Sequence, residues 1–464
     1  MNICLIQPKT VGYDNFPPLG LGYIGTVAKV AGHSVKIIDL EIEQKKYADL
    51  IVEIKQHNPK LVGITSTIRS KKEALKIAEL LKDYNVVFGG PQSTSEPEEY
   101  LKRKTVEQIK TFVLKGESEK TFLKLLDYLD EKISLEQVTN LVYKKGEEVI
   151  TSEAEPIIKD LDTIPIVDRS IFNLPRYNSK FFLKKATNII TSRGCPFRCS
   201  FCFHDFHGKI YRRRSAKNVI AEIEYLYNTF NYRAFIIYDD NFTVDKQRLI
   251  DICNLILEKK LKILWRCLSR VNVLDEYLMR LMKKAGCQEI AFGIESSSPE
   301  TLLRINKMIK PEESAKAMSL CRKVGIVSKA YMMIGFPWET KKMIEDTIDF
   351  ACQILPYDAQ FSVLTPLPNT EIYDQTINMG YEIDRDFDFT RFDPCFETEN
   401  FTKEEIVTLQ RKAVKKFNKA KLIYTIKHPY SHFAFYVARE YAQETFYKLK
   451  KLFSSLKNQL FARA

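Results

Sequence analysis

The stretch TSRGCPFRCSFCFHDFHG, residues 191–208, brings three cysteines close together. Cys195, Cys199 and Cys202 are spaced Cys-x3-Cys-x2-Cys, beside Gly194 and Pro196. The chain has 10 cysteines, but the other seven lie singly in apolar surroundings, where free cysteine packs as a small hydrophobe. The three clustered cysteines therefore predict a loop that binds a metal ion or a metal cluster.

Repeating strand and helix patterns surround this loop. From about residue 188 the apolar runs NIITS, AFIIYDD, ILWRCL, EIAFGIES, SKAYMMIG and QFSVLTP are each followed by a helical stretch. Six such units predict a partial (β/α)6 barrel over residues 188–384. The cysteine loop follows the first strand, so we expect it at the C-terminal mouth of the barrel, where barrel enzymes keep their chemistry.

The first 130 residues show a similar rhythm in shorter form. The runs NICLIQP, SVKIIDL, LVGITS, VVFGG and TFVLKG alternate with amphipathic stretches, which predicts a doubly wound, flavodoxin-like (Rossmann-type) domain. In such sheets ligands bind at the carboxyl ends of the strands. Gly20, Gly22, Gly89 and Gly90 are expected there, since glycine lets the backbone approach a ligand closely.

The remaining segments are less regular. Residues 131–187 have weak periodicity, several prolines and paired acids, and predict a linker. Residues 385–464 change to helical patterns and predict a basic C-terminal helical domain, because most of the net charge of +12 lies beyond Phe401. Such a tail favours an anionic partner or a well-solvated surface.

The bulk composition is that of a soluble protein. The chain has 464 residues, 45% hydrophobic and 28% charged, which suits two or three domains. No apolar run reaches the roughly 18 residues that a membrane span needs. The start, MNICLIQPKT, lacks the zones of a signal peptide. We therefore expect a cytoplasmic protein whose cysteines are mostly reduced.

The residues alone leave three alternatives for what the cysteine loop binds: a zinc ion, a 4Fe–4S cluster, or no metal. A structural zinc site needs four ligands, and His204 or His207 could supply the fourth. A 4Fe–4S cluster normally takes four thiolates, so three would leave one iron open to chelate a small molecule such as S-adenosylmethionine. Free thiols without any metal are the third alternative.

The motifs resemble a known superfamily. Cys195-x3-Cys199-x-Phe201-Cys202 resembles the radical S-adenosylmethionine (radical SAM) signature, including the aromatic residue before the third cysteine. DDNF at residues 239–242, FGIES, GFPWET and TPLPNTEIY are also similar to that superfamily. PPLGLGYIG, FGGPQS, KGESEK and DLDTIPIVDRSIF resemble the cobalamin-binding domain fused to many members. The resemblance covers about residues 1–400.

The group that the chain resembles is the cobalamin-dependent, class B one, which includes carbon and phosphorus methylases and an anaerobic oxidative cyclase of chlorophyll synthesis. The resemblance implies three cofactors: a 4Fe–4S cluster, S-adenosylmethionine and cobalamin. Cys195, Cys199 and Cys202 would ligate the cluster, and the four glycines would lie near cobalamin.

The resemblance also implies five contacts to S-adenosylmethionine. Phe201 would place its backbone or ring against the adenine, and Glu295 would accept hydrogen bonds from the ribose hydroxyls. Asp239 and Asn241 would lie near the amino group or its loop. Arg270 would meet the carboxylate.

One departure concerns cobalamin. The chain lacks the Asp-x-His-x-x-Gly motif that supplies an axial histidine to cobalt in some cobalamin enzymes, and His33 and His57 are the only histidines before the cysteine loop. The alternative is a domain that has lost cobalamin and only supports the barrel.

The leading functional hypothesis is an enzyme that cleaves S-adenosylmethionine reductively to a 5′-deoxyadenosyl radical and modifies an unactivated carbon, foremost by methyl transfer from methylcobalamin. An oxidative cyclisation, rearrangement or deoxygenation without methyl transfer is the alternative. No individual catalytic residue is predicted. The reaction implies a small-molecule or lipid substrate, a flavodoxin or ferredoxin as electron donor, and oxygen sensitivity.

The basic tail supports two further hypotheses. Its last stretch carries an apolar stripe with lysines between its members, which would suit a membrane surface and a lipid substrate: Phe446, Leu449, Phe453, Leu456 and Leu460. Nucleic acid is the weaker alternative. The tRNA-modifying relatives carry an additional N-terminal cysteine set and a β-rich tail, and this chain has neither.

Overall fold

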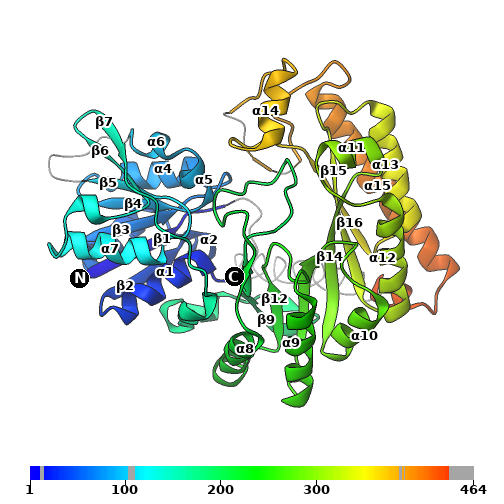
Figure 1. The fold of residues 1–464 in the computed structure, drawn as a ribbon, viewed down its shortest axis with the longest axis horizontal. Coiled ribbons are helices and arrows are strands. Elements are labelled where there is room, and N and C mark those ends of the chain that lie inside the picture. Colours follow the sequence, from blue (N-terminus) through cyan, green and yellow to red (C-terminus); the bar gives the residue numbers. More distant parts are fainter. Residues whose placement is uncertain (11–14, 103–109, 386–388, 391, 438–464) are drawn as a thin grey trace, which may run out of the picture.

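The computed structural model describes residues 1–10, 15–102, 110–385, 389–390 and 392–437 (Figure 1). The apolar stripe predicted at residues 446–460 lies outside the described residues. Two sheets, each flanked by helices, stand side by side in Figure 1, the N-terminal one in blue and cyan and the second in green and yellow.

The N-terminal sheet has the strand order β2-β1-β3-β4-β5-β6-β7. Its first five strands pair in parallel: β1 (Asn2–Gln7), β2 (Ser34–Asp39), β3 (Leu61–Thr65), β4 (Val86–Gly89) and β5 (Thr111–Leu114). The order 2-1-3-4-5 is that of a flavodoxin-like domain, so this prediction is confirmed.

Helices cover both faces of this sheet, and a hydrophobic core lies on each side. They are α1 (Leu19–Val30), α2 (Leu40–Glu43), α3 (Tyr47–His57), α4 (Lys71–Glu79), α5 (Pro91–Ser95), α6 (Pro97–Tyr100) and α7 (Glu119–Leu129). Strands buried on both faces read as continuous apolar runs, and β1 is buried from Ile3 to its end.

The predicted linker contributes to the first sheet as well as connecting the domains. β6 (Leu141–Lys145) and β7 (Glu148–Thr151) extend that sheet with antiparallel pairs. Beyond β7 the segment runs back over α1. There the Tyr177 hydroxyl donates to an Asp39 carboxylate oxygen at 2.8 Å, which ties the end of β2 to the linker.

The second sheet has the order β16-β15-β14-β13-β12-β9-β8. Six strands pair in parallel, as the partial barrel requires, and β8 (Lys180–Phe181) adds a short antiparallel edge. The six are β9 (Lys184–Ile189), β12 (Ala234–Ile237), β13 (Leu264–Ser269), β14 (Cys287–Glu295), β15 (Val327–Ile334) and β16 (Asp358–Val363).

The barrel helices pack on the outer face of the second sheet around the largest hydrophobic core. They are α8 (Ala216–Phe230), α9 (Lys246–Glu258), α10 (Glu276–Lys284), α11 (Pro299–Arg304), α12 (Pro311–Val324) and α13 (Lys341–Ile354). The alternation of strand and helix confirms the predicted (β/α)6 arrangement.

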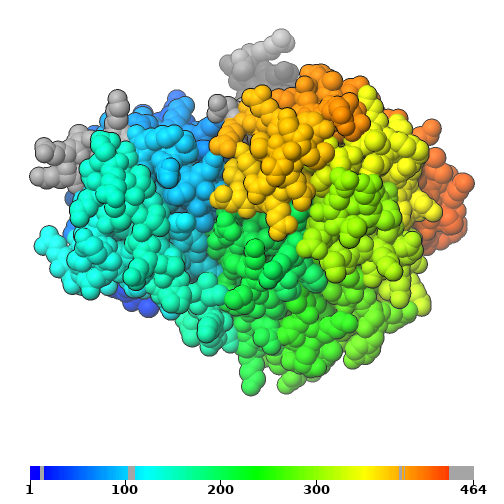
Figure 2. Space-filling model, turned by 45° about the horizontal axis from the view of Figure 1, so that its top comes forward, coloured from blue at the N-terminus to red at the C-terminus, as the bar shows by residue number. Residues whose placement is uncertain are grey.

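Helices α14 and α15 follow the last barrel strand, and α15 lies in the region predicted to be helical. α14 (Glu371–Asn378) belongs to a segment that lies against the N-terminal domain in Figure 2, where the Asn369 amide donates to the Ser95 carbonyl at 3.2 Å. α15 (Lys403–Lys427) packs on the last strand, with the rings of Phe417 and Phe361 6.4 Å apart. No helix within the described ranges is long and apolar enough to cross a membrane.

Candidate functional site

The cysteine loop leaves the first barrel strand through a short ladder of β10 (Ser192–Arg193) and β11 (Arg212–Arg213). It therefore lies at the carboxyl end of the barrel strands, as predicted. Cys199 is buried, Cys195 is half-buried and Cys202 is exposed, and all three thiols are free.

Asp239 fixes the start of this loop. Its carboxylate accepts hydrogen bonds from the Thr191 backbone N–H at 2.6 Å, the Thr191 hydroxyl at 2.5 Å and the Ser192 hydroxyl at 2.6 Å. The residue is 1% exposed. Its oxygens thus shape the loop, and a contact to the amino group of S-adenosylmethionine stays a prediction.

Asn241 also serves the local backbone. Its side-chain oxygen accepts from the Thr243 backbone N–H at 3.3 Å and the Thr243 hydroxyl at 3.1 Å. The Thr243 hydroxyl in turn lies 2.7 Å from the Ser269 hydroxyl. Asn241 thereby joins the end of the second barrel strand to that of the third.

Arg270 points at the cysteine loop. One guanidinium nitrogen lies 3.8 Å from the Cys199 sulfur, and the guanidinium carbon lies 3.7 Å from the centre of the Phe197 ring. A second nitrogen donates to the Lys307 carbonyl. Arg270 therefore supports the cysteine loop, and its contact to a ligand carboxylate stays a prediction.

Glu295 forms a buried ion pair that sequence reasoning missed. Its carboxylate lies 2.7 Å from the Lys307 ammonium, and both side chains are less than a tenth exposed. The ammonium also lies 5.7 Å from the centre of the Phe201 ring. A Cβ at Gly293 would come within 2.5 Å of the carboxylate and 2.7 Å of the ammonium. The missing side chain of Gly293 therefore makes room for the pair.

The charges around Cys199 fit an anionic cluster. Arg270 and Lys307 are buried cations, and among the described residues Glu295 is the one carboxylate paired with them. Burial disfavours the charge on Lys307, but Glu295 and then Cys199 outweigh it and raise the pKa of the lysine. Buried charge is costly unless an opposite charge compensates it, and thiolates on an iron–sulfur core supply that charge.

In the described part of the chain, no three side chains of His, Cys, Asp or Glu converge on the position of a single metal ion. The cysteines as cluster ligands stay a prediction.

A cavity lies at the carboxyl ends of the N-terminal strands. The cavity has a volume of about 250 Å³ and opens to solvent. Its walls are mostly apolar side chains: Leu5, Leu21, Ile24, Ile64, Val87, Phe88, Leu114 and Phe122. Ile190, Arg193, Phe206 and His207 close it from the barrel side. The cavity therefore lies between the two domains, beside the cysteine loop.

Three of the four predicted glycines line this cavity. A Cβ at Gly20 or Gly89 would meet nothing within 4 Å, so both leave open space that a bulky ligand can fill. Gly90 has φ +103°, and its Cβ would lie 2.6 Å from the Ser66 carbonyl oxygen; its backbone requires glycine. The apolar walls and the open cradle fit a large, partly apolar ligand such as cobalamin.

Gly22 does not line the cavity. A Cβ there would lie 2.7 Å from Val167 and 3.0 Å from Phe172. Gly22 instead permits close packing of α1 against the linker, which the sequence alone did not distinguish from a ligand contact.

Glu117 joins the two domains at the rim of the cavity. Its carboxylate accepts from the Arg212 guanidinium at 2.8 Å, lies 3.1 Å from Nδ1 of His207 and 3.5 Å from the Arg193 guanidinium. Glu119 forms a second ion pair with Arg193. Burial disfavours the Glu117 carboxylate, but hydrogen bonds from Arg212 and His207 outweigh it and lower its pKa to about 2.

The three consecutive arginines, residues 212–214, all pair with carboxylates. Arg212 pairs with Glu117, while the next two arginines bind Asp245 and Glu222. They therefore help to hold the start of the barrel together.

The two histidines of the N-terminal domain lie away from the cavity, whereas one histidine of the cysteine loop lines it. Nδ1 of His33 lies 3.3 Å from the N-terminal amine, and Nε2 of His57 lies 3.0 Å from the Ile3 carbonyl oxygen. Neither lines the cavity, whereas His207 does. Nε2 of His204 is buried without a hydrogen-bond partner among the described residues.

Together, a flavodoxin-like domain, a partial barrel with a three-cysteine loop and a shared cavity define a two-domain cofactor-dependent enzyme. The Radical SAM superfamily description matches residues 189–351, and the B12 binding domain description matches residues 9–126. The chain belongs to the radical SAM superfamily and carries an N-terminal B12-binding domain. It is an enzyme whose cofactors are a 4Fe–4S cluster, S-adenosylmethionine and cobalamin.

Two relatives are similar over most of the chain. An uncharacterized methyltransferase of Pyrococcus horikoshii is 35% identical over 453 residues, which cover 95% of this chain and 97% of that protein. The anaerobic magnesium-protoporphyrin IX monomethyl ester cyclase of Cereibacter sphaeroides is 28% identical over 410 residues, covering 85% of this chain and 65% of that protein.

A solved structure shares the fold. The cobalamin-dependent S-adenosylmethionine radical enzyme OxsB, with aqua-cobalamin and S-adenosylmethionine bound, matches with a TM-score of 0.73 and 17% identity. The match covers 92% of this chain and 67% of that one. At this identity the likeness concerns the fold alone.

Proposed function

We propose that the protein transfers a methyl group to an unactivated carbon of a small-molecule or lipid substrate. The cluster and S-adenosylmethionine, held by the cysteine loop and its neighbours, would supply a 5′-deoxyadenosyl radical, and cobalamin in the N-terminal cavity would supply the transferable methyl group. One observation carries the proposal. Phe206 and His207, which follow the last cysteine of the loop, also line the cavity that begins at Gly89. The two cofactor sites therefore share a wall.

The cysteine loop and its supports form the first half of the site. Cys195, Cys199 and Cys202 hold the cluster. Arg270 positions their loop by its contacts to Phe197 and Cys199. Asp239 anchors the point where the loop leaves the first strand.

The ion pair between Glu295 and Lys307 forms the second half of the site. Glu295 accepts hydrogen bonds from the ribose hydroxyls, and Lys307 holds its carboxylate in place. Phe201, which stands beside the Lys307 ammonium, contacts the adenine. Lys307 replaces Arg270 as the candidate partner of the ligand carboxylate, because the Arg270 guanidinium is already engaged.

Oxidative cyclisation without methyl transfer is the second candidate, and the similarity to the cyclase of Cereibacter sphaeroides favours it. Either reaction needs an electron, for which a flavodoxin or ferredoxin is the proposed donor. We propose a cytoplasmic location, and place the domain boundaries near residues 130, 187 and 384. Membrane contact through residues 446–460 stays a prediction.

Anaerobic purification with iron, sulfide and hydroxocobalamin, followed by metal analysis, tests the cofactor sites. We expect a 4Fe–4S cluster and one cobalamin per chain, and loss of iron but not of cobalt in Cys199→Ala. Methyl-labelled S-adenosylmethionine then separates the two reactions. Label in a product of a cell extract supports methyl transfer. Release of 5′-deoxyadenosine with every label retained in methionine or S-adenosylmethionine contradicts it and favours the second candidate.

A further inference from the structure

The second half of α15 and the turn after it have an unusual charge composition. Every charged side chain from Ile406 to Val437 is basic. The helix packs against the barrel through Ile406, Ala413 and Phe417, which are buried. Its other face is open to solvent. Some of its basic side chains contact the barrel, and others form no ion pair with it.

Three lysines are engaged with the barrel. Lys412 pairs with Glu345, Lys416 with Asp349, and Lys421 lies 4.2 Å from the centre of the Tyr357 ring. These contacts help to dock the helix.

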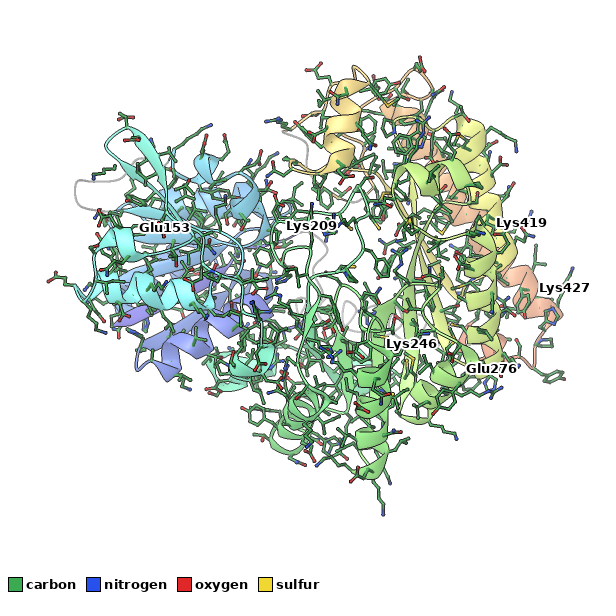
Figure 3. The ribbon with its side chains drawn as sticks, in the orientation of Figure 1. Glu153, Lys209, Lys246, Glu276, Lys419 and Lys427 are labelled. Carbon is green, nitrogen blue, oxygen red and sulfur yellow. The ribbon has the colours of Figure 1, made fainter. Side chains whose placement is uncertain are left out.

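Arg411, Lys415, Lys419 and Lys427 are exposed and form no ion pair with any described residue. Arg411, Lys415 and Lys419 follow each other at intervals of four residues and so share one helix face. In Figure 3, Lys419 and Lys427 lie at the edge of the molecule opposite the N-terminal domain. These cations are available to a partner.

The same face becomes apolar toward its end. Leu422 is 48% exposed, Ile423 is 44% exposed and Ile426 is 68% exposed. Tyr430 is fully exposed in the turn that follows. Leu422, Ile423 and Ile426 follow Lys419 by three, four and seven residues and so lie on the same helix face. The cations and the apolar side chains therefore form one continuous surface.

This apolar tip belongs to a folded part of the chain. The Phe433 ring, after the turn, is buried between Tyr424 and Tyr357, at centroid distances of 5.1 Å and 5.6 Å. Within the turn the Ser431 backbone N–H donates to the His428 carbonyl at 3.1 Å. The packing of Phe433 and the hydrogen bond in the turn therefore fix the position of the exposed end of α15.

Cations and aliphatic side chains on one face, without acids, suit an anionic lipid bilayer. Leucine and isoleucine gain free energy on entering the boundary between headgroups and acyl chains, and lysine and arginine are attracted to anionic headgroups. A nucleic acid would use the cations but gain nothing from aliphatic side chains, since bases stack on aromatic rings. The charge and the apolar content together favour lipid.

We propose that this surface, formed by Arg411, Lys415, Lys419, Leu422, Ile423, Ile426, Lys427 and Tyr430, docks the protein on an anionic membrane. This proposal goes beyond the proposed reaction. The surface is also separate from the apolar stripe predicted at residues 446–460. Docking here would keep the enzyme at the lipid surface while the cofactor sites, on the other side of the second sheet, remain accessible.

The test is co-sedimentation of the full-length protein with vesicles of phosphatidylcholine alone or mixed with phosphatidylglycerol. We expect binding only to the mixed vesicles, weakened by added salt. Lys415→Glu with Lys419→Glu should weaken binding more than tenfold, since each cation near an anionic surface contributes about fivefold. Leu422→Ser with Ile426→Ser should also weaken it at least about tenfold.

Val30→Ser is the matched control, because Val30 is 76% exposed on α1 in the other domain; this variant should bind as the unchanged protein does. Circular dichroism and the melting temperature confirm that each variant is folded. The proposal is overturned if no vesicle is bound, or if the α15 variants bind normally while removal of residues 438–464 abolishes binding. It is also overturned if Ile426→Ser only dissolves a dimer, or if homopolymeric RNA is bound and vesicles are not.

Discussion

Glu117→Gln should loosen the contact between the two domains. The substitution removes the charge that faces Arg212, His207 and Arg193 while it preserves the shape of the side chain. Arg193 keeps Glu119 as a partner. Arg212, whose side chain is 4% exposed, loses the one carboxylate that it contacts among the described residues. The variant therefore leaves a buried cation without compensation.

The loss of free energy of unfolding expected for Glu117→Gln follows from two independent arguments. The pKa of Glu117 falls from 4.5 to about 2, which corresponds to about 3 kcal/mol of free energy of unfolding. Removal of one partner from a buried ion pair typically costs about 3–5 kcal/mol. Both point to a loss of about 3 kcal/mol at neutral pH.

The sign of the pH dependence is fixed by the lowered pKa. The ionised carboxylate contributes its full stability above pH 4.5 and loses that contribution as the pH falls toward 2. The difference between Glu117→Gln and the unchanged protein should therefore be constant near neutrality and shrink on acidification through this window.

Thermal unfolding followed by circular dichroism, with limited proteolysis of the linker, measures the effect. Glu153→Gln serves as the control, because Glu153 is an exposed glutamate just after β7, the edge strand of the first sheet (Figure 3). We expect a melting temperature several degrees lower and faster cleavage between the domains in Glu117→Gln alone. Equal melting temperatures at pH 7, or a difference that persists unchanged at low pH, would refute the reasoning.

Four further substitutions, at Lys307, Gly89 and Gly90, test the cofactor sites and the backbone beside them. Lys307→Met should weaken binding of S-adenosylmethionine to the reconstituted protein at least about tenfold, because Glu295 is left buried without its partner. Lys307→Arg should restore part of the affinity. A dissociation constant of Lys307→Met equal to that of the unchanged protein would count against a role of the ion pair in binding. Gly89→Ala should melt like the unchanged protein yet retain less cobalt, since its Cβ points into open space. Gly90→Ala should instead lower the melting temperature, because its Cβ would meet the Ser66 carbonyl oxygen; normal folding of that variant would contradict the assignment of backbone strain.

The sequence by itself determined the two folds and the position of the cysteine loop. Apolar runs with regular helical intervals specify parallel strands and crossover helices locally, so the five-strand order and the six barrel units agree with the prediction. The spacing of Cys195, Cys199 and Cys202 is likewise a local property of eight residues. The extension of the first sheet by β6 and β7 was not predicted from the sequence, because these strands of five and four residues are too short to show a clear period.

Only the tertiary structure decided which side chains face a ligand and which support the loop. Asp239 and Arg270 carry the charges that a ligand contact would need, yet both are engaged by the cysteine loop. Lys307 has no motif of its own and acquires its role because Gly293 leaves space for the pair with Glu295. Charge and residue type are written in the sequence, but burial and partner choice depend on contacts between residues far apart along the chain, and those contacts exist only once the chain has folded.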